Sequence, residues 1–352
     1  MMYDYLVVGC GLAGICFAEK AIQNHKSVVV IDKGNSSSEV AGGVFNAVIL
    51  KRFTLSGNAQ KQIVLLREFY AELEKKLGID FLHYIKTYRR IASIEEQNNF
   101  VVASDKPLFK EFLSSEILSN PYTSVIAPYG LGEIYQTGYL DTSLLINSYK
   151  KYLTQQESLL EENFDYDKLK IHEDFVEYNG IKAKKVIFAE GMGLKNNPYF
   201  GELPLDGVKG ELLIIRSKEL KTNAIIKSDI FILPICNDLY KVGATYNWSD
   251  KTTIPTEEAK QELLEGLEGT INCEFEVVEH FAGIRPTVRD RKPLVGRHFE
   301  YSNLYVLNGL GTRGVMQAPY YAEKLFDFIE FDLPLEHEAN IARIYNKKSK
   351  CE

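Results

Sequence analysis

The chain opens with a glycine-rich turn between two segments of different periodicity. Residues 5–8 are an apolar run of the kind buried in a parallel sheet, and they lead directly into GCGLAG at residues 9–14, a GxGxxG motif. Small and apolar side chains then recur at helical spacing, and residues 27–31 form a second apolar run that ends at Asp32. This order predicts a β-α-β unit.

Each part of the motif has a physical task in binding a pyrophosphate. Gly9 allows the tight turn, Gly11 lets the backbone approach the anion, and Gly14 brings the helix close to the strand. Asp32 can accept hydrogen bonds from an adenosine ribose. We therefore predict a dinucleotide site, with NAD and FAD both open; the alternative is a tightly packed turn with Asp32 as a solvated charge. The predicted contacts here are Gly9, Gly11, Leu12, Ala13, Gly14, Asp32 and Lys33.

The C-terminal part of the chain repeats this arrangement. Residues 303–307 read as a strand, NGLGTRG at residues 308–314 is a second glycine-rich turn, and a helix with apolar side chains at helical spacing follows. Such a turn presents backbone N–H groups to negative charge, although a plain strand-to-helix turn is the alternative. The predicted contacts are Gly309, Gly311, Thr312, Arg313, Gly314 and Val315, together with Gly42, Gly43 and Asn46 in a small-residue loop and Ala189 and Gly191 after an apolar strand.

The middle of the chain mixes one helical pattern with many short strands. Residues 59–77 have helical periodicity, residues 81–128 read as short β-like runs, and Asp141 is a candidate N-cap for a further helix. β-Branched segments follow at residues 211–215, 229–235, 239–245 and 273–280.

These patterns predict an α/β fold in which a Rossmann-like nucleotide-binding domain is interrupted by an inserted α+β substrate domain on a mixed, mostly antiparallel sheet. We assign residues 1–55, 141–205 and 286–352 to the first domain, and residues 56–140 and 206–285 to the second.

Composition excludes several classes of protein. The 352 residues carry 41 basic and 48 acidic side chains, a net charge of −7. This charge argues against a protein whose whole surface binds nucleic acid. No apolar run reaches the roughly 18 residues of a membrane span, and we expect no signal peptide. The five scattered cysteines, Cys351 among them, and the six histidines form no metal-ligand pattern, so we expect no metal and a reducing cytoplasm.

Taken together, these segments resemble the FAD-dependent oxidoreductases of the D-amino acid oxidase and glycine oxidase group. The resemblance covers nearly the whole chain. It rests on YDYLVVGCGLAGICFAEKA (3–21), VIFAEG (186–191), FILP (231–234), LYKVGAT (239–245), AGIRPTVRDRKPLVG (282–296) and NLYVLNGLGTRGVMQAP (303–319). Within the group, the last two motifs and LPL (333–335) are most similar to the flavin domain of the bifunctional bacterial enzyme that builds methylaminomethyl-thiouridine at the tRNA wobble position.

The resemblance implies a noncovalently bound FAD whose isoalloxazine ring lies between the two domains. The family oxidises a C–N bond by hydride transfer to flavin N5, and oxygen usually reoxidises the flavin. It also implies that Arg285 binds a substrate carboxylate through its two-pronged guanidinium. A structural ion pair of Arg285 with Asp290 or another acid is the alternative.

The resemblance also bears on four other residues. Phe231 stands where D-amino acid oxidase has a substrate-contacting tyrosine, so that enzyme's substrate range does not carry over. Lys241 corresponds to a lysine that assists oxygen reduction in sarcosine oxidases, with an exposed strand lysine as the alternative. Tyr246 is a candidate pocket wall or plain packing, and Arg313 a candidate partner of reduced flavin or of a substrate acid.

We therefore expect an FAD-dependent amine or amino acid oxidase or dehydrogenase, with oxygen or a quinone as electron acceptor. Two alternatives are the FAD-dependent demodification of carboxymethylaminomethyl-uridine in tRNA, which needs a basic track, and a non-catalytic flavin-binding protein.

Overall fold

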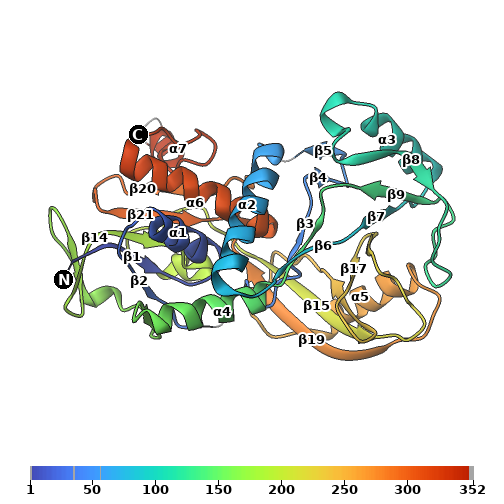
Figure 1. The fold of residues 1–352 in the computed structure, drawn as a ribbon, viewed down its shortest axis with the longest axis horizontal. Coiled ribbons are helices and arrows are strands. Elements are labelled where there is room, and N and C mark those ends of the chain that lie inside the picture. The colour runs from blue at the N-terminus through green and yellow to red at the C-terminus, as the bar shows by residue number, and fades with distance from the viewer. Residues whose placement is uncertain (1, 35, 56, 349–352) are drawn as a thin grey trace.

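The computed structural model describes residues 2–34, 36–55 and 57–348. Its first sheet is built around the segments predicted as the β-α-β unit, and its central strands are parallel (Figure 1). In spatial order the sheet contains β11 (Leu159–Leu160), β2 (Val28–Ile31), β1 (Met2–Val8), β14 (Ile181–Phe188), β13 (Val176–Tyr178) and β12 (Leu169–Ile171), while β21 (Leu304–Asn308) pairs with β14 and β20 (Leu294–Arg297) with β21.

The two ends of the described chain meet in this sheet. β14 lies between β1 and β21, and the helices that follow those outer strands, α1 (Leu12–Gln23) and α6 (Gly314–Phe331), pack against each other. Ala318, Ala322 and Leu325 of α6 are fully buried, as the helical spacing predicts. The first and last glycine-rich turns are thereby brought to one edge of one sheet.

Two further helices complete this hydrophobic core. α2 (Ala59–Leu77) ends at Gly78, which has the left-handed conformation expected of a C-terminal glycine. α4 (Thr142–Gln155) begins at Asp141, whose carboxylate accepts a hydrogen bond from the Leu144 amide at 3.0 Å. Both helices were predicted from the sequence, and both bury their apolar faces with α1 and α6.

The second sheet is mixed but mostly antiparallel, as predicted, with one parallel pair. Its order is β19 (Glu276–Arg285), β15 (Val208–Arg216), β18 (Leu239–Gly243), β17 (Phe231–Pro234), β16 (Ile225–Lys227), β7 (Thr87–Arg90), β9 (Leu131–Ile134) and β8 (Leu113–Leu118). α5 (Glu257–Glu268) covers one face, where Leu263 and Leu267 share a core with Ile226 and Ile232. The opposite face, which we call the inner face, turns toward the loop around Gly42.

Two helices differ from the sequence prediction. Residues 94–104 form α3 (Ile94–Ser104), where β-like runs were predicted, and residues 257–268 form α5, where no element was predicted. Residues 124–127 make an isolated bridge through Val125 and no strand. Ser93 and Thr256 cap the two helices by accepting hydrogen bonds from backbone amides three residues on. Serine or threonine followed by glutamates was the missed signal.

The division into two domains stays a proposal. The small sheet of β3 (Val44–Phe45), β10 (Gly138–Leu140) and β6 (Leu82–Tyr84) joins segments that we assigned to different domains, and α2 packs on α6. The remaining elements are the hairpin of β4 (Val48–Ile49) with β5 (Thr54–Leu55), and α7 (Ala342–Lys348).

Within residues 2–34, 36–55 and 57–348, no helix is long and apolar enough to cross a membrane, and no three His, Cys, Asp or Glu side chains gather as a metal site. Cys10, Cys16, Cys236 and Cys273 are not disulfide-bonded. Cys351 lies outside the described residues.

Candidate functional site

The first glycine-rich turn is packed so tightly that two of its positions require glycine. Gly9 has φ +101°, and a Cβ there would lie 2.5 Å from the carbonyl oxygen of Ala189. A Cβ on Gly14 would lie 1.9 Å from the carbonyl oxygen of Gly9, which is shorter than any nonbonded contact between heavy atoms. The Ala189 amide donates to the Val8 carbonyl at 2.8 Å, so the ends of β1 and β14 lie side by side.

The N-terminus of α1 is open to an anion. Its N-cap is Gly11, which offers no side-chain cap, and its first turn contains no acidic residue. The Leu12 amide reaches the Ser38 hydroxyl only at 3.5 Å, and the following residue, Ala13, is half-buried. Backbone N–H groups at such a terminus, together with the helix dipole, favour a bound phosphate.

Asp32 is buried and held by three donors. One carboxylate oxygen accepts from the Cys10 amide at 2.9 Å, and the other accepts from the Gly34 amide at 2.9 Å and lies 2.7 Å from Lys150 Nζ. The alternative of a solvated charge is therefore wrong. The neighbouring Lys33 is exposed.

The second glycine-rich turn lies beside the first. A Cβ on Gly314, the first residue of α6, would be 3.4 Å from the Leu12 side chain at the start of α1. Gly309 and Gly311 have φ +74° and +55°, and the N-cap position of α6, Arg313, makes no side-chain cap. Thr312 is exposed and Val315 is buried. The Gly191 carbonyl accepts from the Asn308 side chain at 3.0 Å, which ties the turn after β14 to the end of β21.

The loop around residue 42 joins this cradle to the inner face of the second sheet. A Cβ on Gly42 would lie 2.5 Å from the tip of the Phe231 ring, and a Cβ on Gly43 would lie 2.0 Å from the Leu140 carbonyl oxygen. Lys241 Nζ donates to the Ala41 carbonyl at 3.2 Å. In the same loop, Asn46 donates to the Val48 carbonyl at 2.6 Å.

Arg285 is a half-buried guanidinium without an acid partner. It lies over Gly210, where a Cβ would come within 2.0–2.2 Å of its terminal atoms, and it donates to the Thr245 carbonyl at 3.1 Å. No carboxylate of a described residue lies within 4 Å of it. Asp290, the partner in the alternative reading, instead lies 3.5 Å from Arg343, so that pairing is wrong. Burial lowers the pKa of Arg285.

Lys241 and Tyr246 are both candidates from the sequence, and of the two the structure places Tyr246 beside Arg285. Lys241 is half-buried, which contradicts the exposed-lysine alternative, and burial lowers the pKa of its ammonium against an opposing influence of Asp141. The Tyr246 ring is 43% exposed, lies 5.5 Å from the Arg285 guanidinium and meets Trp248 edge-on at 5.9 Å. Tyr246 therefore lies exposed beside Arg285, and its role as a pocket wall stays a proposal.

One positioning residue was not foreseen from the sequence. Lys209 is 1% exposed, and its ammonium lies 2.6 Å from Asp250 and 3.2 Å from Glu211. Its amide also donates to the Asn247 carbonyl at 2.8 Å, so it ties the loop that carries Tyr246 to β15. A lysine and a glutamate within an otherwise apolar strand were the available signal.

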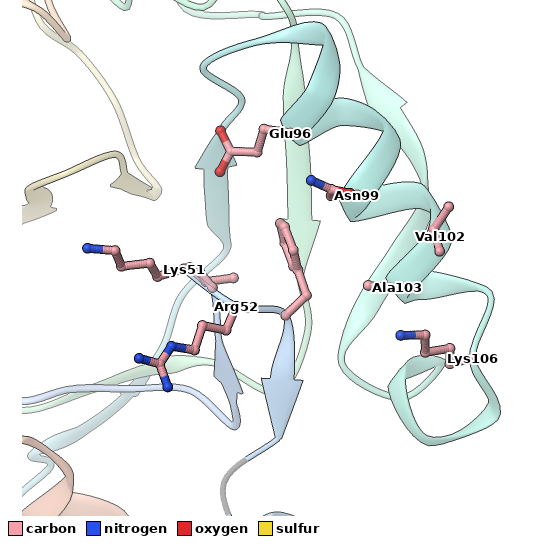
Figure 2. Close-up of a pocket in the computed structure, with 9 residues that line it drawn as sticks. Lys51, Arg52, Glu96, Asn99, Val102, Ala103 and Lys106 are labelled. Carbon is pink, nitrogen blue, oxygen red and sulfur yellow. The ribbon is translucent and has the colours of Figure 1, made fainter.

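A separate hollow of about 370 Å³ lies between α3 and the β4–β5 hairpin, as Figure 2 shows. Lys51 and Arg52 extend from the hairpin, while Glu96 and Lys106 come from the α3 side. None of the residues predicted from the sequence lines it.

The residues of the cradle fit an adenine dinucleotide. Two helix N-termini without side-chain caps lie side by side, Gly9 and Gly14 at the first of them leave no room for a Cβ, and a buried carboxylate stands at the end of β2. An open helix N-terminus suits a pyrophosphate and a strand-end carboxylate suits a ribose, whereas the inner face opposite would receive the reactive ring.

This arrangement defines the class of FAD-dependent oxidoreductases. The family model described as DAO, FAD dependent oxidoreductase, matches residues 4–327, and the chain belongs to that family.

Its relatives include glycine oxidase of Bacillus subtilis strain 168, which is 22% identical, with 93% of each chain covered. The glycine oxidase structure from Bacillus cereus superposes with a TM-score of 0.79 at 20% identity, covering 94% of this chain and 96% of that one. The tRNA 5-methylaminomethyl-2-thiouridine biosynthesis bifunctional protein of Legionella pneumophila strain Philadelphia 1 is 23% identical over 94% of this chain, which spans 54% of that longer protein.

Proposed function

We propose that this protein oxidises the C–N bond of a small amine that carries a carboxylate, an amino acid or an N-substituted amino acid. The observation that carries the proposal is Arg285, a half-buried guanidinium on the inner face without a carboxylate partner in the described chain. A buried cation lacking its counter-charge is costly unless a ligand supplies one. Similarity to two glycine oxidases supports the same class of substrate.

Arg285 binds the substrate carboxylate in this proposal. Its guanidinium can donate two parallel hydrogen bonds to a carboxylate, and Gly210 beneath it leaves the required space. One hydrogen bond to the Thr245 carbonyl fixes the guanidinium plane, and the loop tied down by Lys209 holds Tyr246 beside it. The substrate is thereby oriented before reaction, which removes much of the entropic barrier.

The other inner-face residues shape the surroundings of the reacting carbon. Phe231 contributes an apolar surface next to Gly42 and excludes water there. Lys241 holds its ammonium 3.2 Å from the Ala41 carbonyl, where a positive charge can stabilise a reduced oxygen species. Bound FAD would accept the hydride from the carbon next to nitrogen, leaving an imine that water hydrolyses and passing its electrons to oxygen or another acceptor.

Anaerobic mixing of the FAD-loaded protein with candidate amines tests the proposal. The panel contains glycine, sarcosine, D-alanine, L-proline, iminodiacetate, matched amines without a carboxylate, and tRNA that carries carboxymethylaminomethyl-uridine. We expect at least one free amino acid to bleach the flavin absorbance and the amines without a carboxylate to leave it unchanged. If only the tRNA bleaches the flavin, or if no amine does, the proposal is wrong.

A further inference from the structure

The loop after β18 brings an aromatic residue onto the inner face. This loop pairs with β15 at one residue, where Lys209 and Asn247 exchange backbone hydrogen bonds of 2.8 and 2.9 Å. The antiparallel register sets Tyr246 opposite Gly210, and directly opposed residues point to the same face of a sheet. Because Leu213 of the same strand packs under α5 and side chains alternate along a strand, Gly210 belongs to the inner face together with Tyr246.

The Arg285 guanidinium and two aromatic rings form a continuous surface. The centre of the Tyr246 ring lies 5.5 Å from Arg285 Cζ, and the Trp248 ring meets Tyr246 at 5.9 Å with an angle of 72° between the planes. Tyr246 is exposed and Trp248 is half-buried. Open aromatic surface next to a binding group is typical of ligand sites.

The other directions around Arg285 are filled. A Cβ on Gly283 would lie 2.7 Å from the Val40 side chain, and a Cβ on Gly243 would lie 1.9 Å from the Leu212 side chain. Gly283 lies two residues before Arg285 on β19, and Leu212 is the next inner-face residue of β15 beyond the glycine under the guanidinium. A substituent on a carboxylate bound by Arg285 therefore has its open path toward the two rings.

The two rings are held in place by polar groups behind them. Asn247, which lies between them in sequence, accepts hydrogen bonds through its side-chain oxygen from the Ser249 and Asp250 amides at 2.7 and 3.1 Å. The Asp250 carboxylate lies 2.6 Å from the buried ammonium of Lys209. Aromatic side chains that are already fixed lose little conformational entropy when a ligand packs on them, so this anchoring favours binding.

One further cation lies beside the rings. Lys251 Nζ is 6.0 Å from the centre of the Trp248 ring, but it pairs with Asp206 at 2.9 Å and donates to the Gly207 carbonyl at 2.7 Å. Arg285 has no such acid partner among the described residues. The anionic group of a ligand therefore goes to Arg285, and its uncharged part goes to the rings.

We propose that Tyr246 and Trp248 form an aromatic subsite beside Arg285, and that the substrate is an amino acid whose side chain or nitrogen carries a flat ring. This inference rests on the proposed function, because it extends the same site. The two residues determine specificity, since the ring packs against their open surface while Arg285 binds the carboxylate. A benzene ring and a pyrimidine base share this chemistry.

Inhibitor binding tests the subsite without turnover. FAD-loaded protein is titrated with acetate, phenylacetate, 3-phenylpropionate and cyclohexylacetate. Binding is followed by the flavin spectrum and by the emission of Trp248, the only tryptophan of the chain. We expect the better aryl acid to bind at least tenfold more tightly than acetate and threefold more tightly than cyclohexylacetate, and to change the Trp248 emission.

Variants assign the preference to the two rings. Tyr246→Ala and Trp248→Leu should each reduce the preference for the aryl acid over acetate to less than threefold, whereas Tyr246→Phe should retain it. Tyr129→Ala removes a tyrosine of similar exposure, 39% against 43%, from the turn before β9 and should keep the full preference. An aryl acid that binds no more tightly than acetate, or a preference that survives Tyr246→Ala, would overturn the subsite.

Substrate pairs extend the test to catalysis. Anaerobic flavin reduction is measured with glycine against D- and L-phenylalanine, and with sarcosine against N-benzylglycine and 5-carboxymethylaminomethyluridine. We expect one ring-bearing substrate to half-saturate at a concentration at least tenfold below that of its partner, and Tyr246→Ala to remove this difference. Preference for the nucleoside identifies a modified pyrimidine as the ring, and preference for the others identifies an aryl amino acid. Lower half-saturating concentrations for glycine and sarcosine would overturn the subsite.

The two proposals fail in different ways. If no amine bleaches the flavin but Tyr246→Ala still removes the aryl preference, the subsite stands and the proposed oxidation is wrong. If glycine or sarcosine bleaches the flavin and aryl acids bind no better than acetate, the oxidation stands and the subsite is wrong. Bleaching by modified tRNA but by no free nucleoside or amino acid would overturn the assignment to a small ring-bearing substrate.

Discussion

The two sheets differ in whether their buried charged side chains have ion-pair partners. Around the first sheet, three buried or half-buried carboxylates form ion pairs: Asp32 with Lys150, Glu19 with Lys76, and Glu330 with Lys26. On the inner face of the second sheet, Arg285, Lys227 and Lys241 have no carboxylate within 4 Å among the described residues.

The contrast separates structure from function. Paired charges complete the fold by themselves, whereas unpaired buried cations store a cost that only a ligand of opposite charge removes. We propose that the cradle of the first sheet binds FAD through backbone N–H groups, and that the inner face binds substrate through side-chain charge. Substitutions in the cradle should therefore reduce FAD binding, whereas substitutions on the inner face should reduce substrate binding.

The largest effect is expected at Gly14. A Cβ there would lie 1.9 Å from the Gly9 carbonyl oxygen, so Gly14→Ala must push α1 away from β1. We expect the variant to lose at least a hundredfold in FAD affinity and roughly 2–5 kcal/mol of stability. Fluorescence titration with FAD and thermal unfolding measure both quantities. Gly57→Ala, at a position with nothing within 4 Å, is the control and should bind FAD normally.

Arg285→Ala tests whether the inner face binds the substrate carboxylate. Removing a desolvated partner of a carboxylate should weaken substrate binding by about 2–5 kcal/mol while FAD content stays the same. Steady-state and anaerobic titrations with the best amino acid measure this loss. Arg216→Ala removes an exposed arginine from the neighbouring strand β15 and should have no effect. Unchanged affinity in Arg285→Ala would reject its role.

Lys241→Met separates reduction of the flavin from its reoxidation. Because we propose that Lys241 stabilises negative charge on oxygen, we expect reoxidation by oxygen to slow by about 10- to 100-fold. Anaerobic reduction by substrate should change less than twofold. Stopped-flow mixing of the reduced protein with oxygen makes the measurement. Slowed reduction with normal reoxidation would contradict this assignment.

Lys150→Met tests the ion pair of Asp32 beside the first sheet. The substitution leaves the buried Asp32 carboxylate with only its two amide donors, so it should destabilise the protein without FAD by about 1–3 kcal/mol. If the adenosine ribose donates to Asp32, saturating FAD should restore part of that stability. Urea unfolding with and without FAD gives the comparison. An equal loss in both conditions would argue against ribose binding by Asp32.

Local patterns allowed much of the first sheet to be predicted. The glycine motif, the strand before it and Asp32 are contiguous in sequence, so their geometry follows from short-range chemistry. α3 and α5 were missed because each buries two apolar side chains, Phe100 and Ala103 in α3 and Leu263 and Leu267 in α5. The capping signals at Ser93 and Thr256 were the better evidence.

The cationic part of the site depended on the tertiary fold. Arg285 and Lys241 could be proposed from the sequence through a family resemblance, but their lack of acid partners could not. Lys227 gave no signal at all, since its position beside Arg89 depends on the pairing of β16 with β7. Unpaired charge is a property of the assembled fold.

A structure of the FAD-loaded protein with its tightest carboxylate ligand tests the central claim most directly. We predict that the ligand's carboxylate lies within hydrogen-bond distance of the Arg285 guanidinium. A ligand bound instead in the hollow beside Lys51 and Arg52, with the inner face holding no carboxylate, would contradict it.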